Sequence, residues 1–206
     1  MFEFEAGPHK FSCPLQKTVC SYKTFDYSKE CKAQVVQGGP YCLYHMLKVY
    51  KLKLQASTIK GAGNGVYAWD LEAPNGIVFK KGEYIIEYTG EILGPDQLYK
   101  RYGPNTAPYA MATDDDQVFI DSACNRTMGA MINGSYGSAQ GKENTSFFVD
   151  GTRVFVMAER SIKHGEELFL DYGSEYGKGE HAMNHKTVVK TTTKRIISKR
   201  KKQTST

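Results

Sequence analysis

The pattern of short apolar runs after Thr58 constrains the fold of this chain more than any other feature. From Thr58 to residue 157, runs of four to seven residues rich in Val, Ile, Tyr and Phe alternate with Gly, Pro, Asn and Asp. Runs of this length between turn-forming residues are typical of strands. The sequence therefore predicts a mainly β fold, largely antiparallel, with few helices. We expect strands at 65–69, 77–79, 84–88, 108–113, 117–121, 146–149 and 153–157.

The composition fits one medium globular domain with short attachments. The chain has 206 residues, of which 40% are hydrophobic and 24% charged, which is enough to bury a core. Glu3 and Glu5 lie where a signal peptide would need a basic start and an apolar run. No apolar stretch approaches the ~18 residues of a membrane-spanning helix. We therefore expect a soluble intracellular protein whose five cysteines are thiols or metal ligands rather than disulfides.

The charge of the chain is unevenly distributed. Residues 186–206 hold eight Lys or Arg residues and no acidic residue, whereas the first 185 residues hold 19 basic and 22 acidic residues. A mildly acidic body suits a basic peptide substrate, and a basic tail suits nucleic acid, chromatin or an import receptor. Lys194-Arg195 and the run from Lys199 to Lys202 resemble a nuclear import signal, which favours a nuclear, chromatin-associated location. The alternatives are a merely solvated tail or a nonspecific contact with nucleic acid.

Three cysteines and one histidine in the first 50 residues have the spacing of metal ligands. Cys20, Cys31, Cys42 and His45 follow a Cys-x10-Cys-x10-Cys-x2-His pattern. The close Cys42/His45 pair can chelate one ion from a turn or the first turn of a helix, and the other two thiols complete the tetrahedral set that zinc favours. Cys13 could replace Cys20 as a ligand or stay free. The alternative is a set of unconnected buried or free thiols.

The same spacing resembles the WRC module, a small plant-type module with three cysteines and one histidine. The last two spacings agree and the first is one residue shorter in that module, so the resemblance covers about 26 residues. Small zinc sites of this kind are mostly structural, because they organise loop-rich units that are too small to fold by burial alone. We expect such a module at residues 1–50.

The segment 43–55 has apolar positions at helical spacing. This pattern predicts a short connecting helix with one packing face, which links the module to the β-rich part of the chain. The apolar positions are Leu43, Met46, Leu47, Tyr50 and Leu54.

Four short segments, in a fixed order over about a hundred residues, carry a family resemblance. They are Gly-Ala-Gly-Asn-Gly at 61–65, Tyr-Thr-Gly-Glu at 88–91, Ile-Asn at 132–133 and Asp-Tyr-Gly at 171–173. Together they resemble the SET domain of protein lysine methyltransferases. The resemblance implies small antiparallel sheets around a knot-like crossing of the C-terminal segment, within residues 51–180. From the charge distribution we expect a basic, flexible tail at 181–206. The glycine-rich segment lacks the following helix and the βαβ alternation of a Rossmann-type methyltransferase.

The resemblance implies transfer of a methyl group from S-adenosylmethionine to a lysine amine, in a basic tail such as a histone's. The amine has an unperturbed pKa of ~10.4 and must lose a proton, and the nitrogen, methyl and sulfur must be brought into line. A desolvated channel beside the sulfonium charge lowers the pKa of an amine. In the family this channel is lined by tyrosines.

Two tyrosines match the channel of the family. By this resemblance Tyr172 is the catalytic tyrosine, which orients the amine and favours the cationic sulfonium, and Tyr109 lines the same channel. An ordinary strand tyrosine that caps a core is the alternative for Tyr172, and Tyr88 is expected to be structural. Leu170, two residues before Tyr172, has no hydroxyl with which to hold a water, and this leans toward multiple methylation.

The glycine turn and the Ile-Asn segment match the cofactor-binding elements of the family. The turn corresponds to one whose backbone approaches the methionine end of the ligand, where a Cβ would block the approach or forbid the backbone angles. Asn133 corresponds to the asparagine of an Asn-His pair in the family, and Gly134 stands here in place of the histidine. The expected contacts of S-adenosylmethionine are Gly63, Asn64, Gly65, Asn133, Gly134 and Tyr172.

The region around Asn133 departs from the family pattern. Ala130-Met131 replaces an Arg-Phe pair, and a Cys-x-Pro-Asn segment is stretched into residues 134–144, with Asn144 as the counterpart of its last residue. These departures leave a second hypothesis: a catalytically silent SET-like module that recruits chromatin, nucleic acid or protein partners.

Two further features bear on the substrate channel. No cysteine follows Cys124, so the zinc-binding post-SET segment of many relatives is absent, and Tyr176 or the segment to His185 is expected to close the channel instead. The acidic run 114–116 could draw a basic peptide, although a polar turn between two strands is the simpler role. Glu91 is expected to be a structural, hydrogen-bonding carboxylate.

Overall fold

The computed structural model of the chain describes residues 2–6, 9–13, 17–24, 29–36, 40–103, 107–135, 139 and 141–172. In this part of the chain the strands form six small sheets, with only two α-helices. The predicted mainly β fold is therefore confirmed. Apart from the central sheet, the strands are β1 (Phe2–Ala6), β2 (His9–Cys13), β3 (Lys17–Val19), β4 (Gln34–Val36), β5 (Leu52–Ala56), β6 (Asn64–Ala68), β7 (Ile77–Phe79), β9 (Glu91–Leu93), β10 (Ala110–Ala112), β11 (Phe119–Asp121) and β15 (Ile162–Lys163).

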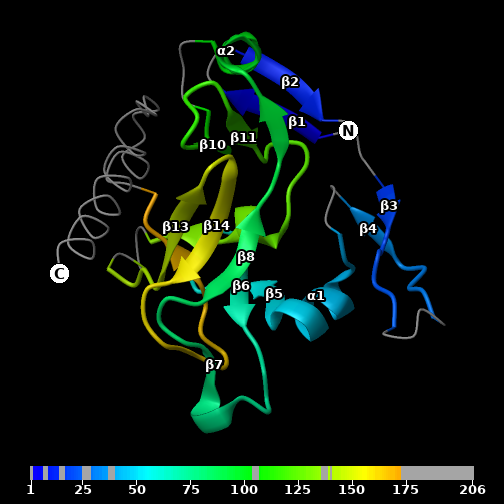
Figure 1. Cartoon of the computed structure of the whole chain (residues 1–206), viewed down its shortest axis with the longest axis vertical. Helices are drawn as coiled ribbons and strands as arrows, with labels where there is room; N and C mark the ends of the chain where they lie inside the picture. Colours follow the sequence, from blue (N-terminus) through cyan, green and yellow to red (C-terminus); the bar gives the residue numbers. More distant parts are fainter. Residues whose placement is uncertain are drawn as a thin grey trace.

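The central sheet has the strand order β12-β16-β13-β14-β8. Its long members are antiparallel and lie side by side in the middle of the molecule (Figure 1). Residues alternate between buried and partly exposed positions along β14, because successive side chains of a strand point to opposite faces. The bounds of these strands are β8 (Tyr84–Tyr88), β12 (Asn133–Gly134), β13 (Thr145–Asp150), β14 (Arg153–Ala158) and β16 (Phe169–Leu170).

The C-terminal segment crosses between two earlier segments of the chain. Strand β16 lies between β12 and β13 and runs parallel to both. Asn144, only 1% exposed, fixes this crossing: its Nδ2 donates to the carbonyl of Glu167 at 2.8 Å, and its Oδ1 accepts from the backbone N–H of Phe169 at 2.9 Å. This is the knot-like crossing that the sequence predicts, and Asn144 has a structural role in it.

One helix ends earlier than the periodicity predicts. Helix α1 covers Leu43–Tyr50, and Lys51 then adopts the left-handed conformation with φ 56°, so residues 52–56 form β5 instead of a continued helix. Leu52 and Leu54 fit both a helix and an alternating strand, and the pairing of β5 with β6 decides between them. Helix α2 (Pro95–Tyr102) was not predicted. Its signals are Pro95 in the first turn and Gln97, whose Oε1 accepts from the backbone N–H at the helix start.

A single large core lies under these sheets, and α1 contributes to it. Met46 of α1 is 4% exposed and packs in this core, with Tyr41 and Tyr50 against it. The fully buried members are Leu52, Val66, Ala68, Val154, Val156, Ile162, Leu168 and Leu170. Neither α1 nor α2, the helices that the structure describes, is long and apolar enough to cross a membrane.

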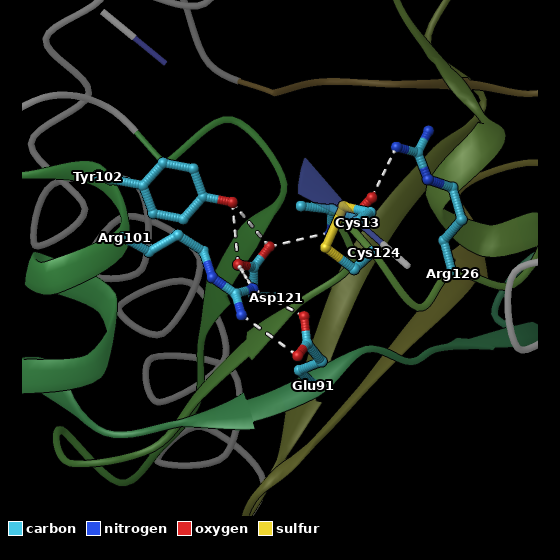
Figure 2. The surroundings of a disulfide bond; sticks show 8 residues. Cys13, Glu91, Arg101, Tyr102, Asp121, Cys124 and Arg126 are labelled. Atoms are coloured by element: carbon cyan, nitrogen blue, oxygen red, sulfur yellow. Dashed lines mark hydrogen bonds and ion pairs between the residues drawn. A yellow bond between two sulfur atoms is a disulfide. The ribbon is translucent and has the colours of Figure 1, made fainter. Parts of the chain in front are cut away.

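The hairpin β1–β2 lies beside α2, away from α1 (Figure 1). A disulfide joins Cys13, the last residue of β2, to Cys124, across a sequence separation of 111 (Figure 2). The expectation that all cysteines are thiols or metal ligands is therefore wrong for this pair, and Cys13 is not a ligand in place of Cys20. The physical reason is tertiary: β2 packs on α2, which no spacing in the sequence reveals.

A buried carboxylate lies next to this disulfide (Figure 2). Asp121 is fully buried; its Oδ2 lies 2.6 Å from Arg101, and its Oδ1 accepts from the N–H of Ala123 at 3.0 Å. The hydroxyl of Tyr102 also donates to Asp121 at 2.9 Å. Glu91, 2.7 Å from Arg101, has the structural role predicted for it. The cluster ties α2 to β9 and β11.

Asp121→Asn is expected to lower the free energy of unfolding by about 3 kcal/mol. The variant leaves Arg101 without its buried counter-charge and turns an amide N–H₂ toward donors of Arg101 or Tyr102. The midpoint of denaturant unfolding measures this loss. Glu87→Gln, which breaks an exposed pair with Arg153, is the control and should leave the midpoint nearly unchanged. Equal midpoints for the two variants would contradict the prediction.

Candidate functional site

The glycine turn connects β5 to β6. The N–H of Ser57 donates to the carbonyl of Gly63 at 2.9 Å, and Gly63 has φ +73°. A Cβ on Gly63 would meet nothing within 4 Å, so the backbone conformation, and not crowding, requires glycine here. The turn consequently leaves open space beside Gly63.

Gly65 is required for a different reason. A Cβ on Gly65 would collide with the carboxylate of Glu167 and would lie 3.3 Å from Nδ2 of Asn133. From the sequence, the approach of a cofactor is the expected reason for the absence of a side chain at this position. The close neighbour that the structure reveals is a carboxylate of the protein itself.

Asn133 and the glycine turn lie together although they are distant in sequence. Nδ2 of Asn133 donates to the carbonyl of Asn64 at 3.1 Å and to Oε1 of Glu167 at 3.3 Å. Gly134 is buried and pairs in parallel with Leu170. The structure thus brings Asn64, Gly65, Asn133 and Gly134 to one place, at the start of the C-terminal crossing.

Glu167 connects the glycine turn, Asn133 and the start of the C-terminal crossing. The sequence did not identify it as a site residue. Its Oε1 accepts from Ser57 Oγ at 2.7 Å, and its Oε2 accepts from the N–H and hydroxyl of Thr58 at 2.8 and 2.6 Å and from the Tyr67 hydroxyl at 3.1 Å. Burial favours the neutral acid, but the hydrogen bonds from Thr58, Ser57 and Asn133 outweigh it and lower the pKa of Glu167. A glutamate directly before a buried apolar run is the signal that could have found it, because such a carboxylate needs donors.

The two tyrosines that were predicted to line a channel are linked through the core. The hydroxyl of Tyr172 donates to the carbonyl of Ile132 at 3.0 Å, and its ring lies 5.7 Å from that of Phe147. Tyr88 packs on the same Phe147 at 5.3 Å and donates its hydroxyl to the backbone carbonyl of Tyr109 at 2.8 Å. Tyr88 therefore has the structural role expected of it, as the connection between Tyr109 and the core below Tyr172.

Tyr109 also carries a cation on its ring. The guanidinium of Arg126 lies 4.6 Å from the ring centroid, a cation–π distance. Arg126 donates to the carbonyl of Ala123 at 2.9 Å, next to the disulfide (Figure 2). The acidic run 114–116 lies in the turn between β10 and β11, where Oδ2 of Asp114 accepts from the N–H of Gly151 at 3.1 Å. This contact fits the simpler role of that run.

The four predicted metal ligands form one cluster. The ligand atoms of Cys20, Cys31, Cys42 and His45 all lie within 4.8 Å of one another. Cys42 directly precedes α1 and His45 lies in its first turn, so the helix presents this pair together. The ring of Tyr22 stacks on His45 at 3.8 Å. Three sulfurs and one imidazole nitrogen at this separation could hold a zinc ion.

A cavity of about 380 Å³ opens on another side of the C-terminal crossing. Thr58, Asn144, Glu167 and Phe169 are among its lining residues. It shares Glu167 with the place described above, but none of the predicted cofactor contacts lines it. Gly173, Tyr176, the segment to His185 and the basic tail lie outside the described residues.

Comparison with known proteins gives one family match. The model of the SET domain family matches residues 77–173, a range that includes Tyr109, Asn133 and Tyr172 but not the glycine turn. The histone-lysine N-methyltransferase MEDEA of Arabidopsis thaliana is 33% identical over 124 residues, which are 58% of this chain and 16% of MEDEA. The chain thus spans about a sixth of that relative.

Among solved structures, the chain is similar to subunits of polycomb repressive complex 2. An active complex in the basal state gives 26% identity and a TM-score of 0.45, covering 60% of this chain and 15% of that one. The Chaetomium thermophilum complex in an autoinhibited conformation, bound to S-adenosylmethionine, gives 23% identity and a TM-score of 0.46, covering 69% and 17%. The family match, together with the crossing of the C-terminal segment, leads to one conclusion: residues 77–173 of this chain form a SET domain.

Proposed function

We propose that the protein is an S-adenosylmethionine-dependent protein-lysine N-methyltransferase. One observation carries the proposal: Ile132-Asn133 joins the two halves of the site. The carbonyl of Ile132 accepts the hydroxyl of Tyr172, while the amide of Asn133 holds the glycine turn through Asn64. The catalytic and cofactor elements predicted from separate segments thus meet at two consecutive residues.

The residues of the turn fit the cofactor. The space beside Gly63 can take a ligand close to the backbone, and the carbonyl oxygen of the Asn133 amide can accept from an ammonium group. Gly63, Asn64, Gly65, Asn133 and Gly134 would hold the methionine part and the adjoining adenosine. The cofactor supplies a methyl group on a positively charged sulfur.

The tyrosines of the chain would position the substrate amine. The hydroxyl proton of Tyr172 is donated to Ile132, and a phenol oxygen whose proton is used can only accept further hydrogen bonds. It therefore favours an amine or another group of positive character in front of it. Tyr109, held by Tyr88, would line the same channel.

The proposed substrate is a lysine in a histone tail, and the proposed location is the nucleus. MEDEA is by name a histone-lysine N-methyltransferase, the body of this chain is mildly acidic, and its tail is basic. Leu170, fully buried in β16 two residues before Tyr172, offers no hydroxyl to a water. We accordingly propose multiple methylation as the product.

We further propose that the Cys/His cluster holds a structural zinc ion. Cys20 is 4% exposed and accepts from the N–H of Cys42 at 3.3 Å. Burial works against the thiolate, but hydrogen bonds from the backbones of Cys42 and Tyr22 help to lower the pKa of Cys20. A thiolate is the form that binds zinc.

The rival function is a silent SET-like module that recruits partners. It is favoured by one observation: Gly134, where the family has histidine, is packed against Leu170, so no side chain is available there to a cofactor. Its prediction is that S-adenosylmethionine does not bind.

Calorimetric titration with S-adenosylmethionine, followed by incubation of core histones with labelled cofactor, tests both functions. We expect binding and transfer of label to one histone. Binding without transfer would direct the search to non-histone substrates. Absence of binding would contradict the proposed enzyme and favour the silent module.

A further inference from the structure

The neighbours of Asn133 determine the orientation of its side chain. Nδ2 lies 3.1 Å from the carbonyl oxygen of Asn64 and 3.3 Å from Oε1 of Glu167. Both groups only accept hydrogen bonds, so an amide oxygen in this position would face two oxygens. Nδ2 has two hydrogens, and the two acceptors use both. Oδ1 is therefore the end of the amide that can contact a ligand.

Glu167 is held firmly enough to impose this orientation. Its carboxylate accepts three further hydrogen bonds from Ser57 and Thr58, at 2.6–2.8 Å. The Tyr67 hydroxyl shares its one proton between the carbonyl of Ala56, at 2.8 Å, and Oε2 of Glu167, at 3.1 Å. Glu167 is 6% exposed. The donors from Ser57, Thr58 and Asn133 favour the ionised acid, and the carboxylate cannot turn away from Asn133 without breaking several hydrogen bonds.

Gly65 keeps the carboxylate and the amide in contact. Any larger residue would place its Cβ onto the carboxylate of Glu167 and against Nδ2 of Asn133. The glycine of the turn, the amide on β12 and the carboxylate that precedes β16 therefore form one unit, although they come from three separate segments.

We infer that Glu167 is a positioning residue, which fixes the Asn133 amide with its oxygen toward the ligand and so makes the site selective for an ammonium group. The inference rests on the proposed use of S-adenosylmethionine, whose methionine part carries an ammonium group beside a carboxylate. An amide oxygen accepts from the first and repels the second, and a flipped amide would do the reverse. Glu167 acts only through Asn133.

The test measures how much binding depends on the ammonium group. Wild type and Glu167→Gln are titrated by calorimetry with S-adenosylhomocysteine and with the same molecule lacking its α-amino group. In the wild type the loss of the amino group is expected to weaken binding about tenfold or more, as for other hydrogen bonds to charged groups. In Glu167→Gln only the carbonyl of Asn64 still favours this orientation, so a larger share of the amides can flip and the difference should shrink to about threefold or less.

The neighbouring carboxylate provides a matched control. Glu166 is partly exposed and pairs with Arg160 at 2.6 Å, so Glu166→Gln should keep the dependence of the wild type. If removal of the α-amino group weakens binding to Glu167→Gln as much as binding to the wild type, the inference is overturned. If neither molecule binds to the wild type, the proposed cofactor fails, and the inference fails with it.

A second variant serves if Glu167→Gln does not fold. Asn133→Asp places another carboxylate beside Glu167. Because two negative charges at this distance repel each other, the pKa of one of the two acids is raised well above that of an ordinary carboxyl group. The protonated form again donates toward Glu167 and presents an oxygen to the ligand. Binding of S-adenosylhomocysteine, relative to wild type, should strengthen from about pH 8 to about pH 6.

Tyr67 does not titrate in this range, because burial and the charge of Glu167 raise its pKa. Tyr67 is the titratable side chain among the donors to Glu167, since Ser57, Thr58 and Asn133 do not titrate. A pH-independent affinity of Asn133→Asp relative to the wild type would therefore overturn the inference.

Discussion

Phenylalanine in place of Tyr172 is expected to slow methyl transfer at least about a hundredfold while S-adenosylmethionine affinity stays within about threefold. The hydroxyl is the only group that the substitution removes. It is held in place by the carbonyl of Ile132, so its oxygen needs no reorganisation to stabilise positive charge during transfer. The ring contact with Phe147 is kept, and the lost hydrogen bond costs only about 1 kcal/mol of stability.

Single-turnover transfer of label and calorimetric binding separate these effects. Tyr99→Phe removes a hydroxyl from an exposed tyrosine on α2, 65% accessible, and should change neither quantity. Full activity of Tyr172→Phe would show that Tyr172 is the strand tyrosine of the alternative interpretation. A large loss of cofactor affinity would instead make it a binding residue.

Removal of the proposed zinc ion is expected to unfold the segment around the cluster and to destabilise the SET domain as well. The free energy of binding for small structural zinc sites is about 10 kcal/mol or more, and much of it is folding free energy. Because His45 lies in the same helix as Met46, a member of the main core, the loss should extend beyond the module. Chelator titration followed by circular dichroism, and the melting temperature, measure the effect.

Two cysteine variants make this prediction specific. We expect metal analysis to find one equivalent of zinc in the wild type and none in Cys42→Ser, since this variant removes one of the clustered sulfur atoms. Cys13→Ser should keep that equivalent, because Cys13 is bonded to Cys124. Loss of zinc in Cys13→Ser, or its retention in Cys42→Ser, would contradict the assignment.

Local patterns predicted the elements that local physics determines. The strands β7 and β8 have the bounds that were expected, and β6, β13 and β14 agree to within one residue, because their apolar runs are bounded by turn residues. The segment after Tyr50 was misread, since its leucines fit two periodicities and only the pairing with β6 distinguishes them. The sequence predicted the members of the Cys/His cluster because metal-ligand chemistry depends on residue type and spacing.

The parts of the site that the sequence did not predict depend on contacts between distant segments. Glu167 has partners about a hundred residues away, at Ser57, Thr58 and Tyr67, and neither propensity nor periodicity points to them. The disulfide could not be predicted from the sequence either, because Cys13 and Cys124 come together through a tertiary contact, the packing of β2 on α2. The reason for Gly65 likewise required the position of Glu167.

The covalent ring closed by Cys13 and Cys124 divides the site into two halves. The glycine turn and Tyr109 lie inside the ring, whereas Asn133 and Tyr172 follow it. A protease that cuts one peptide bond inside the ring leaves a single molecule until the disulfide is reduced. A cut just after Cys124 leaves the fragment that carries Asn133 and Tyr172 without a covalent link to the rest, so this half of the site is retained by noncovalent contacts alone.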